Sequence, residues 1–332
     1  MRAFSLSAQI LREREAYYTR LESTQRGDLD VTPWLAWFLG QVTAAAHAAD
    51  RDQRLARVAV MDEPWGVVIA PDGVKTWVAN TASGTVTVIR RTAPGTFKVK
   101  KQIAVGTEPY GMALTPNGTR LYVSNARSNT VSVIDTSTDA VVGTIAVGPE
   151  PRGIAITNDG DGEDLDETVY VTQFLALLAP GRTEGQDDAK TGRVSVIPTG
   201  SNTVAATAVL QPLASTRFKA NGDALGRIAP GASFSFVTGA YPNQLNGVAI
   251  RGGFAFVPST GVSPNGPSRF DVNVQSLVSA IARTTNTDAG VTKNLQQAVA
   301  LQENPERRFV AVPWAIAFEH AADTGWIASA AS

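Results

Sequence analysis

Three stretches decide the fold of this chain: Val58-Ala59-Val60-Met61-Asp62-Glu63-Pro64, Ile103-Ala104-Val105-Gly106-Thr107-Glu108-Pro109 and Ile145-Ala146-Val147-Gly148-Pro149-Glu150-Pro151. Their first residues lie 45 and 42 residues apart. A period of this length is typical of repeat proteins whose unit is a four-stranded sheet. The chain is therefore expected to be all-β, and such a scaffold hosts many unrelated activities.

Each repeat predicts four short strands joined by turns. Asp72-Gly73 and Asn117-Gly118 are strong hairpin signals, and Thr85–Ile89 alternates polar and apolar residues as a half-buried strand does. First strands are expected near residues 67, 112, 154, 248 and 316. This predicts a β-propeller of about five blades, incomplete or irregularly closed, in which Val58–Val60 is a candidate outermost strand of the last blade. The glycine of each Pro-x-Gly is expected to let the innermost strands lie close together.

The repeats also resemble a known family. Tyr122-Val123-Ser124-Asn125, Asn129–Asp135 and Val141–Gly148 are similar to the YVTN family of β-propeller repeats, and the match is strongest over residues 58–210. The resemblance implies a periplasmic or cell-surface location, and many members of that family have no defined activity.

The N-terminal part is a different kind of sequence. Residues 1–48 predict two helices, 49–57 a linker, and 58–332 the propeller with insertions at 174–191 and 211–245. Phe4–Arg14 and Thr24–Leu39 resemble the C-terminal helices of Fic-family proteins, which transfer AMP to hydroxyl side chains. The HPFxDGNGR-type motif of that family is absent, so the resemblance implies no catalytic residue here.

Composition excludes several classes of function. The absence of cysteine excludes disulfides and covalently attached c-type haem, and a net charge of −1 gives no footprint for nucleic acid. No stretch predicts a membrane span. Ala46-His47-Ala48 looks like a signal-peptidase site, but five Arg and five acidic residues precede the apolar run, so we expect a packed helix and no signal peptide.

The candidate sites are few. Asp159, Asp161, Glu163 and Asp164 supply oxygen ligands at close spacing for a Ca²⁺ ion, although their order does not follow the EF-hand pattern and a solvated loop is the alternative. His320 has no second ligand near it, and no Ser-His-Asp set or phosphate loop is present. No catalytic or cofactor-binding residue is therefore predicted, and calcium is the only candidate cofactor.

The sequence favours a non-enzymatic binding or scaffolding module that takes a protein or small-molecule ligand at a propeller mouth. Two alternatives stay open. Segments around Phe270–Ser279 and Pro313–Phe318 resemble propellers that precede c-type-haem, peroxidase-like domains. The second alternative is a propeller hydrolase of the lactonase kind, which would need a metal or a His/Glu pair at the mouth.

Overall fold

The chain divides into two compact units. In the computed structural model these are residues 1–59 with 91–98, and residues 60–90 with 99–332. The structure describes residues 58–217, 219–221, 235–265, 273–299, 310–319 and 324–331. The predicted helices of residues 1–48, the linker and His320 lie outside the described residues. Of the first unit only 58–59 and the hairpin end 91–98 are described, so the second unit is the subject below.

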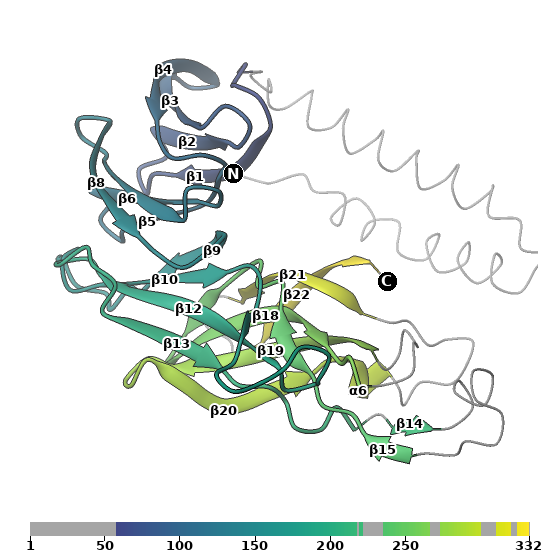
Figure 1. Ribbon diagram of the computed structural model, residues 1–332. Helices are drawn as coiled ribbons and strands as arrows, with labels where there is room; N and C mark the ends of the chain where they lie inside the picture. The colour runs from purple at the N-terminus through teal and green to yellow at the C-terminus, as the bar shows by residue number, and fades with distance from the viewer. Residues whose placement is uncertain are drawn as a thin grey trace, which may run out of the picture. The chain divides into compact units, whose positions relative to one another are not determined.

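The described chain is built from antiparallel sheets that follow one another along the sequence, as a propeller requires (Figure 1). The first three blades, each with four strands from inner to outer, are β1 (Pro64–Ile69), β2 (Lys75–Asn80), β3 (Thr85–Ala93) and β4 (Thr96–Ala104); β5 (Pro109–Leu114), β6 (Arg120–Asn125), β7 (Thr130–Asp135) and β8 (Ala140–Ala146); β9 (Pro151–Ile156), β10 (Thr168–Gln173), β12 (Lys190–Pro198) and β13 (Ala206–Leu210), with β11 (Leu177–Leu178) added beside β12.

Blades four and five are less regular. Blade four consists of β17 (Ala249–Arg251), β18 (Phe254–Val262), β19 (Val274–Ala282) and β20 (Thr287–Asn294), with β16 (Tyr241–Asn243) beside β18; blade five is the pair β21 (Ala311–Phe318) and β22 (Gly325–Ala331). A separate hairpin joins β14 (Lys219–Asn221) to β15 (Ser235–Val237), and α6 (Gln296–Val299) follows β20. Within the described ranges, no helix has the length and apolarity needed to cross a membrane.

The five predicted first strands are confirmed as β1, β5, β9, β17 and β21. The expectation that Val58–Val60 completes the last blade is wrong. These residues belong to no strand, and an outermost strand needs a third strand beside it, whereas the described part of blade five has two. The prediction of about five blades with irregular closure is therefore confirmed, and the irregularity lies in blade five.

Apolar cores fill the spaces between neighbouring blades. Blades one and two enclose Trp77, Val88 and Leu121, while blades two and three enclose Val133, Val171 and Ile197. Blades three and four enclose a third core around Val196 and Val257. These side chains alternate along their strands, so each sheet sends one face to each neighbour, as the period-two pattern predicts.

Glycines let the inner strands approach one another, as expected. A Cβ on Gly66 would lie 2.7 Å from the carbonyl oxygen of Tyr110, and a Cβ on Gly111 would lie 2.2 Å from that of Arg152. A Cβ on Gly153 would lie 2.7 Å from the Cα of Gly247. No side chain fits at these distances, so glycine at this place in the blade is a packing requirement.

The connections of the blades differ between their two edges. Because each blade is antiparallel, the start of every inner strand lies at one edge, which we call the ring edge, and the end of that strand lies at the far edge. The long connections 174–189, 211–248, 263–273 and 295–310 all join strands at the ring edge. At the far edge, only 157–167 departs from short turns. Functional side chains are therefore sought first at the ring edge.

Candidate functional site

A repeated backbone turn begins each inner strand. The residue at the first position of each turn has a left-handed φ between 48° and 53°: Glu63, Glu108, Glu150, Gln244 and Val312. The residue two positions later is the first that can point toward the neighbouring inner strands. These residues are Trp65, Tyr110, Arg152, Asn246 and Trp314, and we call this set the mouth ring.

The structure brings the members of the mouth ring together. The ring centroids of Trp65 and Tyr110 lie 4.8 Å apart, and those of Trp65 and Trp314 lie 5.8 Å apart. The guanidinium carbon of Arg152 lies 4.9 Å from the centroid of Tyr110, and its Nη1 donates a hydrogen bond of 3.3 Å to Oδ1 of Asn246. Five blades thus contribute one side chain each to a continuous set of contacts.

Arg152 is held on both sides by aromatic rings. Phe174, the first residue of the insertion after β10, lies with its centroid 3.4 Å from the guanidinium carbon. Phe174 is fixed by its backbone, which donates to the carbonyl of Glu150 at 2.9 Å and accepts from the amide of Leu245 at 2.9 Å. The Nε of Arg152 is buried and has no hydrogen-bond partner. The guanidinium is therefore pre-organised and keeps an unused donor.

Burial shifts the titration of the neighbouring phenol. Burial raises the pKa of Tyr110 above its usual 10, and the nearby charge and hydrogen bonding of Arg152 offset part of that rise. The Tyr110 hydroxyl is therefore protonated at neutral pH and able to donate a hydrogen bond.

Carboxylates stand two positions before the ring residues in the first three blades. Arg127 links two of them, because its Nε lies 3.3 Å from Oε1 of Glu108 and its Nη1 lies 3.8 Å from Oε1 of Glu150. Both pairs are exposed enough that their contribution to stability is small. Their relevance is chemical, since they place carboxylates at the same edge as an aromatic and cationic surface.

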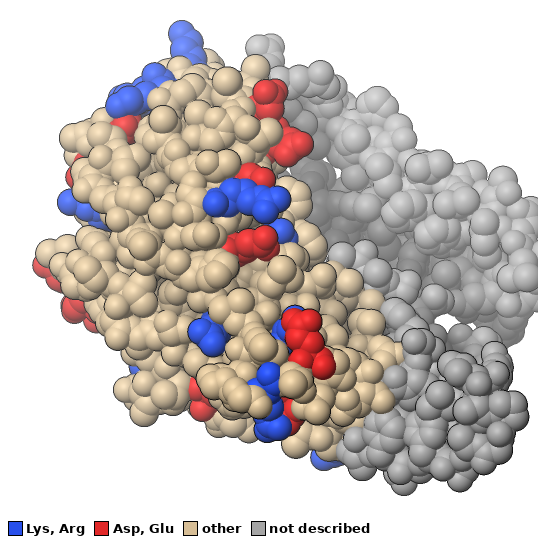
Figure 2. Space-filling view, in the orientation of Figure 1, with Lys and Arg blue, Asp and Glu red and all other residues tan. Residues whose placement is uncertain are grey.

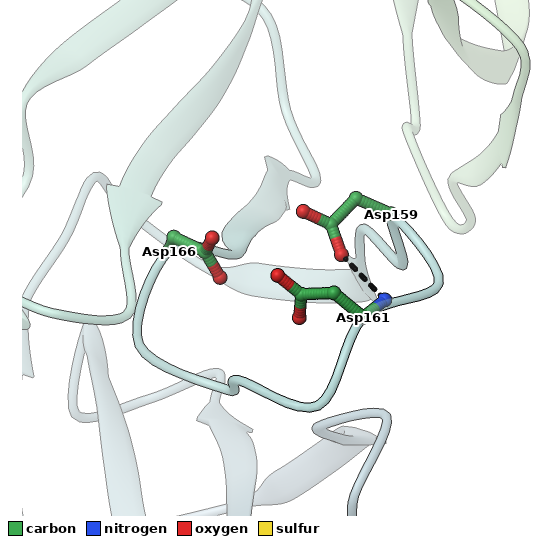
Figure 3. Close-up of side chains that lie close together, drawn as sticks. All are labelled: Asp159, Asp161 and Asp166. Atoms are coloured by element: carbon green, nitrogen blue, oxygen red, sulfur yellow. Dashed lines mark hydrogen bonds between the residues drawn. The ribbon is translucent and has the colours of Figure 1, made fainter.

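The predicted calcium ligands are only partly brought together. Asp159 and Asp161 have carboxylate oxygens within 4.8 Å of each other and of Asp166, a residue the prediction did not include. Figure 3 shows the three carboxylates turned toward the same space within the loop, with the backbone N–H of Asp161 donating to Asp159 at 3.1 Å. All three side chains are exposed, and the loop lies at the far edge of the blades.

Glu163 and Asp164 have other partners. Glu163 accepts from the backbone N–H groups of Asp164 at 3.0 Å and Leu165 at 3.2 Å. Asp164 is buried and caps the first turn of blade two, where it accepts from the backbone of Asn117 at 2.9 Å and the hydroxyl of Thr119 at 2.6 Å. Burial opposes ionisation of Asp164, but these hydrogen bonds outweigh it and hold its pKa below the usual range. A calcium site made of the four predicted residues would have to break this cap.

The insertion 174–191 borders a cavity of about 550 Å³ with residues 211–214, Gly239 and Asn265. Its buried carboxylate, Asp187, accepts from the backbone N–H groups of Gly239 at 2.8 Å and Asn265 at 2.9 Å and from the Ser263 hydroxyl at 3.2 Å. These bonds tie three ring-edge connections together. Asp187 is therefore a structural link between segments that sequence spacing could not have joined.

Sequence reasoning missed the mouth ring. The signal was available, because the variable residue between proline and glycine is large and aromatic or polar in every unit while its neighbours stay the same. The expectation of a scattered surface charge fits the face in Figure 2, where acidic and basic side chains are interspersed among others.

Comparisons with known proteins add enzymes but no family. No family model and no curated protein matches the chain. Solved structures that match include the periplasmic gluconolactonase of Pseudomonas aeruginosa, with 17% identity, 82% of this chain and 65% of that chain covered, and a TM-score of 0.46. A protein described as a candidate 6-phosphogluconolactonase of Bacteroides uniformis matches with 11% identity, 70% and 54% coverage and a TM-score of 0.40.

A third match is the hydrazine synthase of Kuenenia stuttgartiensis, with 20% identity, 72% and 68% coverage and a TM-score of 0.40. This chain thus spans between 54% and 68% of these three structures. The expectation of a non-enzymatic module that is not an enzyme is corrected by these matches, because all three are described as enzymes. Likeness at these scores assigns no substrate to this chain.

Proposed function

We propose that this chain is the propeller of a hydrolase of the lactonase kind, built from YVTN-type repeats, whose substrate binds at the mouth ring. The observation that carries the proposal is the set of contacts from Trp65 through Tyr110 to Arg152, with Trp314 on the other side of Trp65. It combines flat apolar surfaces with a held cation and neutral donors in one place.

The chemistry of the ring suits a cyclic ester of a polyhydroxy acid. Aromatic faces pack on the apolar C–H faces of a sugar-like ring, and Trp65 is 51% exposed, which leaves its surface open to a ligand. The unused Nε–H of Arg152 and the hydroxyl of Tyr110 are donors for a carbonyl oxygen. Asn246 already engages Arg152 and fixes the plane in which that donor points.

The reaction needs an electrophile and a base. Water adds to the lactone carbonyl carbon, and Arg152 and Tyr110 stabilise the negative charge that develops on its oxygen. The ring C–O bond then breaks, the leaving oxygen takes up a proton, and the product is the open hydroxy acid. Glu108 and Glu150 are our candidates for the carboxylate that accepts the proton of the attacking water, because both stand two positions before ring residues.

The test is hydrolysis of glucono-δ-lactone by the full chain, followed by proton release in weakly buffered solution, with and without a chelator. We expect Arg152→Gln to lower kcat/KM by about 10²-fold, because it removes an oxyanion donor. Trp65→Ala should raise KM with a smaller change in kcat, because it removes binding surface common to substrate and transition state. The matched control is Arg90→Gln, an exposed arginine of β3 outside the ring.

Two results would reject the proposal. The first is a rate that does not exceed spontaneous lactone hydrolysis at any enzyme concentration. The second is turnover that Arg152→Gln and Trp65→Ala leave unchanged while Arg90→Gln behaves like the unmodified chain, since the reaction would then occur elsewhere on the molecule.

A further inference from the structure

We propose that a second site, distinct from the mouth ring, lies between blades two and three and binds a small hydroxycarboxylate. It is formed by Gln173 at the end of β10 and by Arg193 and Ser195 on β12. The argument rests on the difference between this blade and the two before it.

Blades one and two share a buried amide that is satisfied by hydroxyls on the next strand. In blade one, Nδ2 of Asn80 donates to the hydroxyls of Thr85 at 3.0 Å and Thr87 at 2.8 Å. In blade two, Nδ2 of Asn125 donates to the hydroxyls of Thr130 at 3.1 Å and Ser132 at 3.0 Å. The side-chain oxygen of each asparagine is buried without a partner.

Blade three changes two members of this arrangement. The amide is the longer Gln173, and Arg193 replaces the first threonine, while Ser195 keeps the second hydroxyl position. The register places them together, because Thr172 pairs with Val194 and Val171 pairs with Ser195, so that Gln173 comes level with Arg193. A neutral hydroxyl pair has thus become a cation beside an amide.

Neither new group has a partner within the part of the chain that the structure describes. The Nε of Arg193 and the Oε1 of Gln173 are buried without a hydrogen bond, and no carboxylate pairs with Arg193. Gln173 is only 4% exposed. An unpaired guanidinium donor and a free acceptor at a buried position are costly, and a ligand that pairs with both removes that cost.

Space for such a ligand is present. A cavity of about 290 Å³ is lined by Gln173, Arg193 and Ser195, with Thr207 of β13 and the segment 146–149 opposite. Gly148 helps to position the amide, since a Cβ there would lie 1.7 Å from Nε2 of Gln173. The cavity volume suits a molecule of a few heavy atoms, and larger polymers do not fit.

The donor and acceptor pattern selects the ligand class. Arg193 offers the paired donors that a carboxylate accepts in a bidentate manner. The Oε1 of Gln173 can only accept, so the ligand must also carry a donor, and a hydroxyl near the carboxylate supplies it. Ser195 and Thr207 can pair with either end. A small 2-hydroxycarboxylate meets all of these requirements.

The experiment titrates the ¹⁵N-labelled full chain with lactate and observes the arginine Nε–H signals. The Arg193 signal is assigned by its disappearance in Arg193→Thr, which restores the residue type of blades one and two. We expect lactate to move this signal saturably, propanoate to bind several-fold more weakly because it lacks the hydroxyl, and methyl lactate to leave the signal unmoved because it lacks the charge.

The variants decide the outcome. Arg193→Thr should weaken lactate binding, followed on backbone amides near Gln173, by at least tenfold, and Arg193→Gln provides the same test if the threonine variant does not fold. Arg152→Gln should bind lactate as the unmodified chain does, so that this result is independent of the mouth ring. The proposal is wrong if lactate moves no signal that belongs to Arg193, or if both Arg193 variants bind lactate with unchanged affinity.

Discussion

Equivalent positions on β1 and β5 have opposite environments. Val67 and Ile69 of β1 correspond in the repeat to Met112 and Leu114 of β5. Met112 and Leu114 pack against the core between blades one and two, whereas Val67 and Ile69 are 60% and 61% exposed. The sequence pattern is the same, so the difference arises from the preceding blade. A full sheet stands before β5, while the described part of blade five before β1 has two strands.

The backbone reports the same contrast. Glycine follows the ring residue in blades one to four, and each of these glycines abuts the next inner strand, at distances for an added Cβ between 2.2 Å and 3.2 Å. Blade five has Ala315 at this position. A junction that tolerates a methyl group is less tightly closed than four that do not. The comparison teaches that each blade depends on its predecessor for burial of its inner strand.

The largest effect is expected at a closed junction. Gly111→Ala should lower the free energy of unfolding by about 3 kcal/mol, because its Cβ would meet the backbone oxygen of Arg152 and backbone cannot easily move aside. Urea unfolding followed by tryptophan fluorescence measures this. Gly253→Ala, where no atom lies within 4 Å of the added Cβ, is the control and should change stability little. Equal losses from both variants would contradict the tight-junction interpretation.

The matched apolar positions should differ in the same direction. Leu114→Ala is expected to cost about 2 kcal/mol, because it removes a side chain that packs on a buried core. Ile69→Ala at the corresponding exposed position should change stability by no more than about 0.5 kcal/mol. Both values come from chemical denaturation. If Ile69→Ala is as costly as Leu114→Ala, then β1 is covered in solution and the asymmetry between the two strands does not hold.

Hydrogen bonds between blades provide a smaller test. The Ser124 hydroxyl accepts from the amide of Gly111 at 2.9 Å and donates to the carbonyl of Arg152 at 2.8 Å, which joins blades two and three. Ser124→Ala should cost about 1 kcal/mol, because both backbone groups lose a partner. Blade one has Ala79 at this place, and Ala79→Ser should leave stability unchanged or raise it. Thermal unfolding checks both, and a stabilising Ser124→Ala would count against this latch.

The smallest effect is a pH dependence at the far edge. Because the pKa of Asp164 is lower in the folded chain than its usual value, its contribution to stability is present above about pH 4 and is lost as the pH falls through the folded pKa. Asp164→Asn should therefore reduce the loss of stability between pH 5 and pH 3. Unfolding curves at several pH values measure this. A variant whose acid sensitivity equals that of the unmodified chain would show that the cap contributes nothing.

The sequence predicted what is local and repeated. The hairpin signals at Asp72-Gly73 and Asn117-Gly118, the alternation in Thr85–Ile89 and the inner-strand glycines all depend on neighbours along one blade or on its exact copy, and all are found in the fold. The failed prediction for Val58–Val60 shows the limit, because a strand motif forms a strand only where a partner edge exists.

The candidate site needed three dimensions. The contacts of Trp65 with Tyr110 and Trp314, and of Arg152 with Phe174, join blades that are far apart in sequence. The acidic loop shows the same limit at short range, since its composition named Asp164 as a ligand while its fold uses Asp164 as a cap and brings in Asp166. Composition gives the kinds of side chain, and topology decides which of them meet.

The separation of long connections from short turns is useful to anyone who modifies this molecule. A library aimed at new ligands belongs in the ring-edge connections, such as 174–189, because those segments surround the candidate site and already vary in length. A fluorophore, a purification handle or a surface linkage belongs at a far-edge turn such as Gly252-Gly253, where no neighbouring atom would obstruct it. The two operations use opposite edges of the blades, so one protein can carry both.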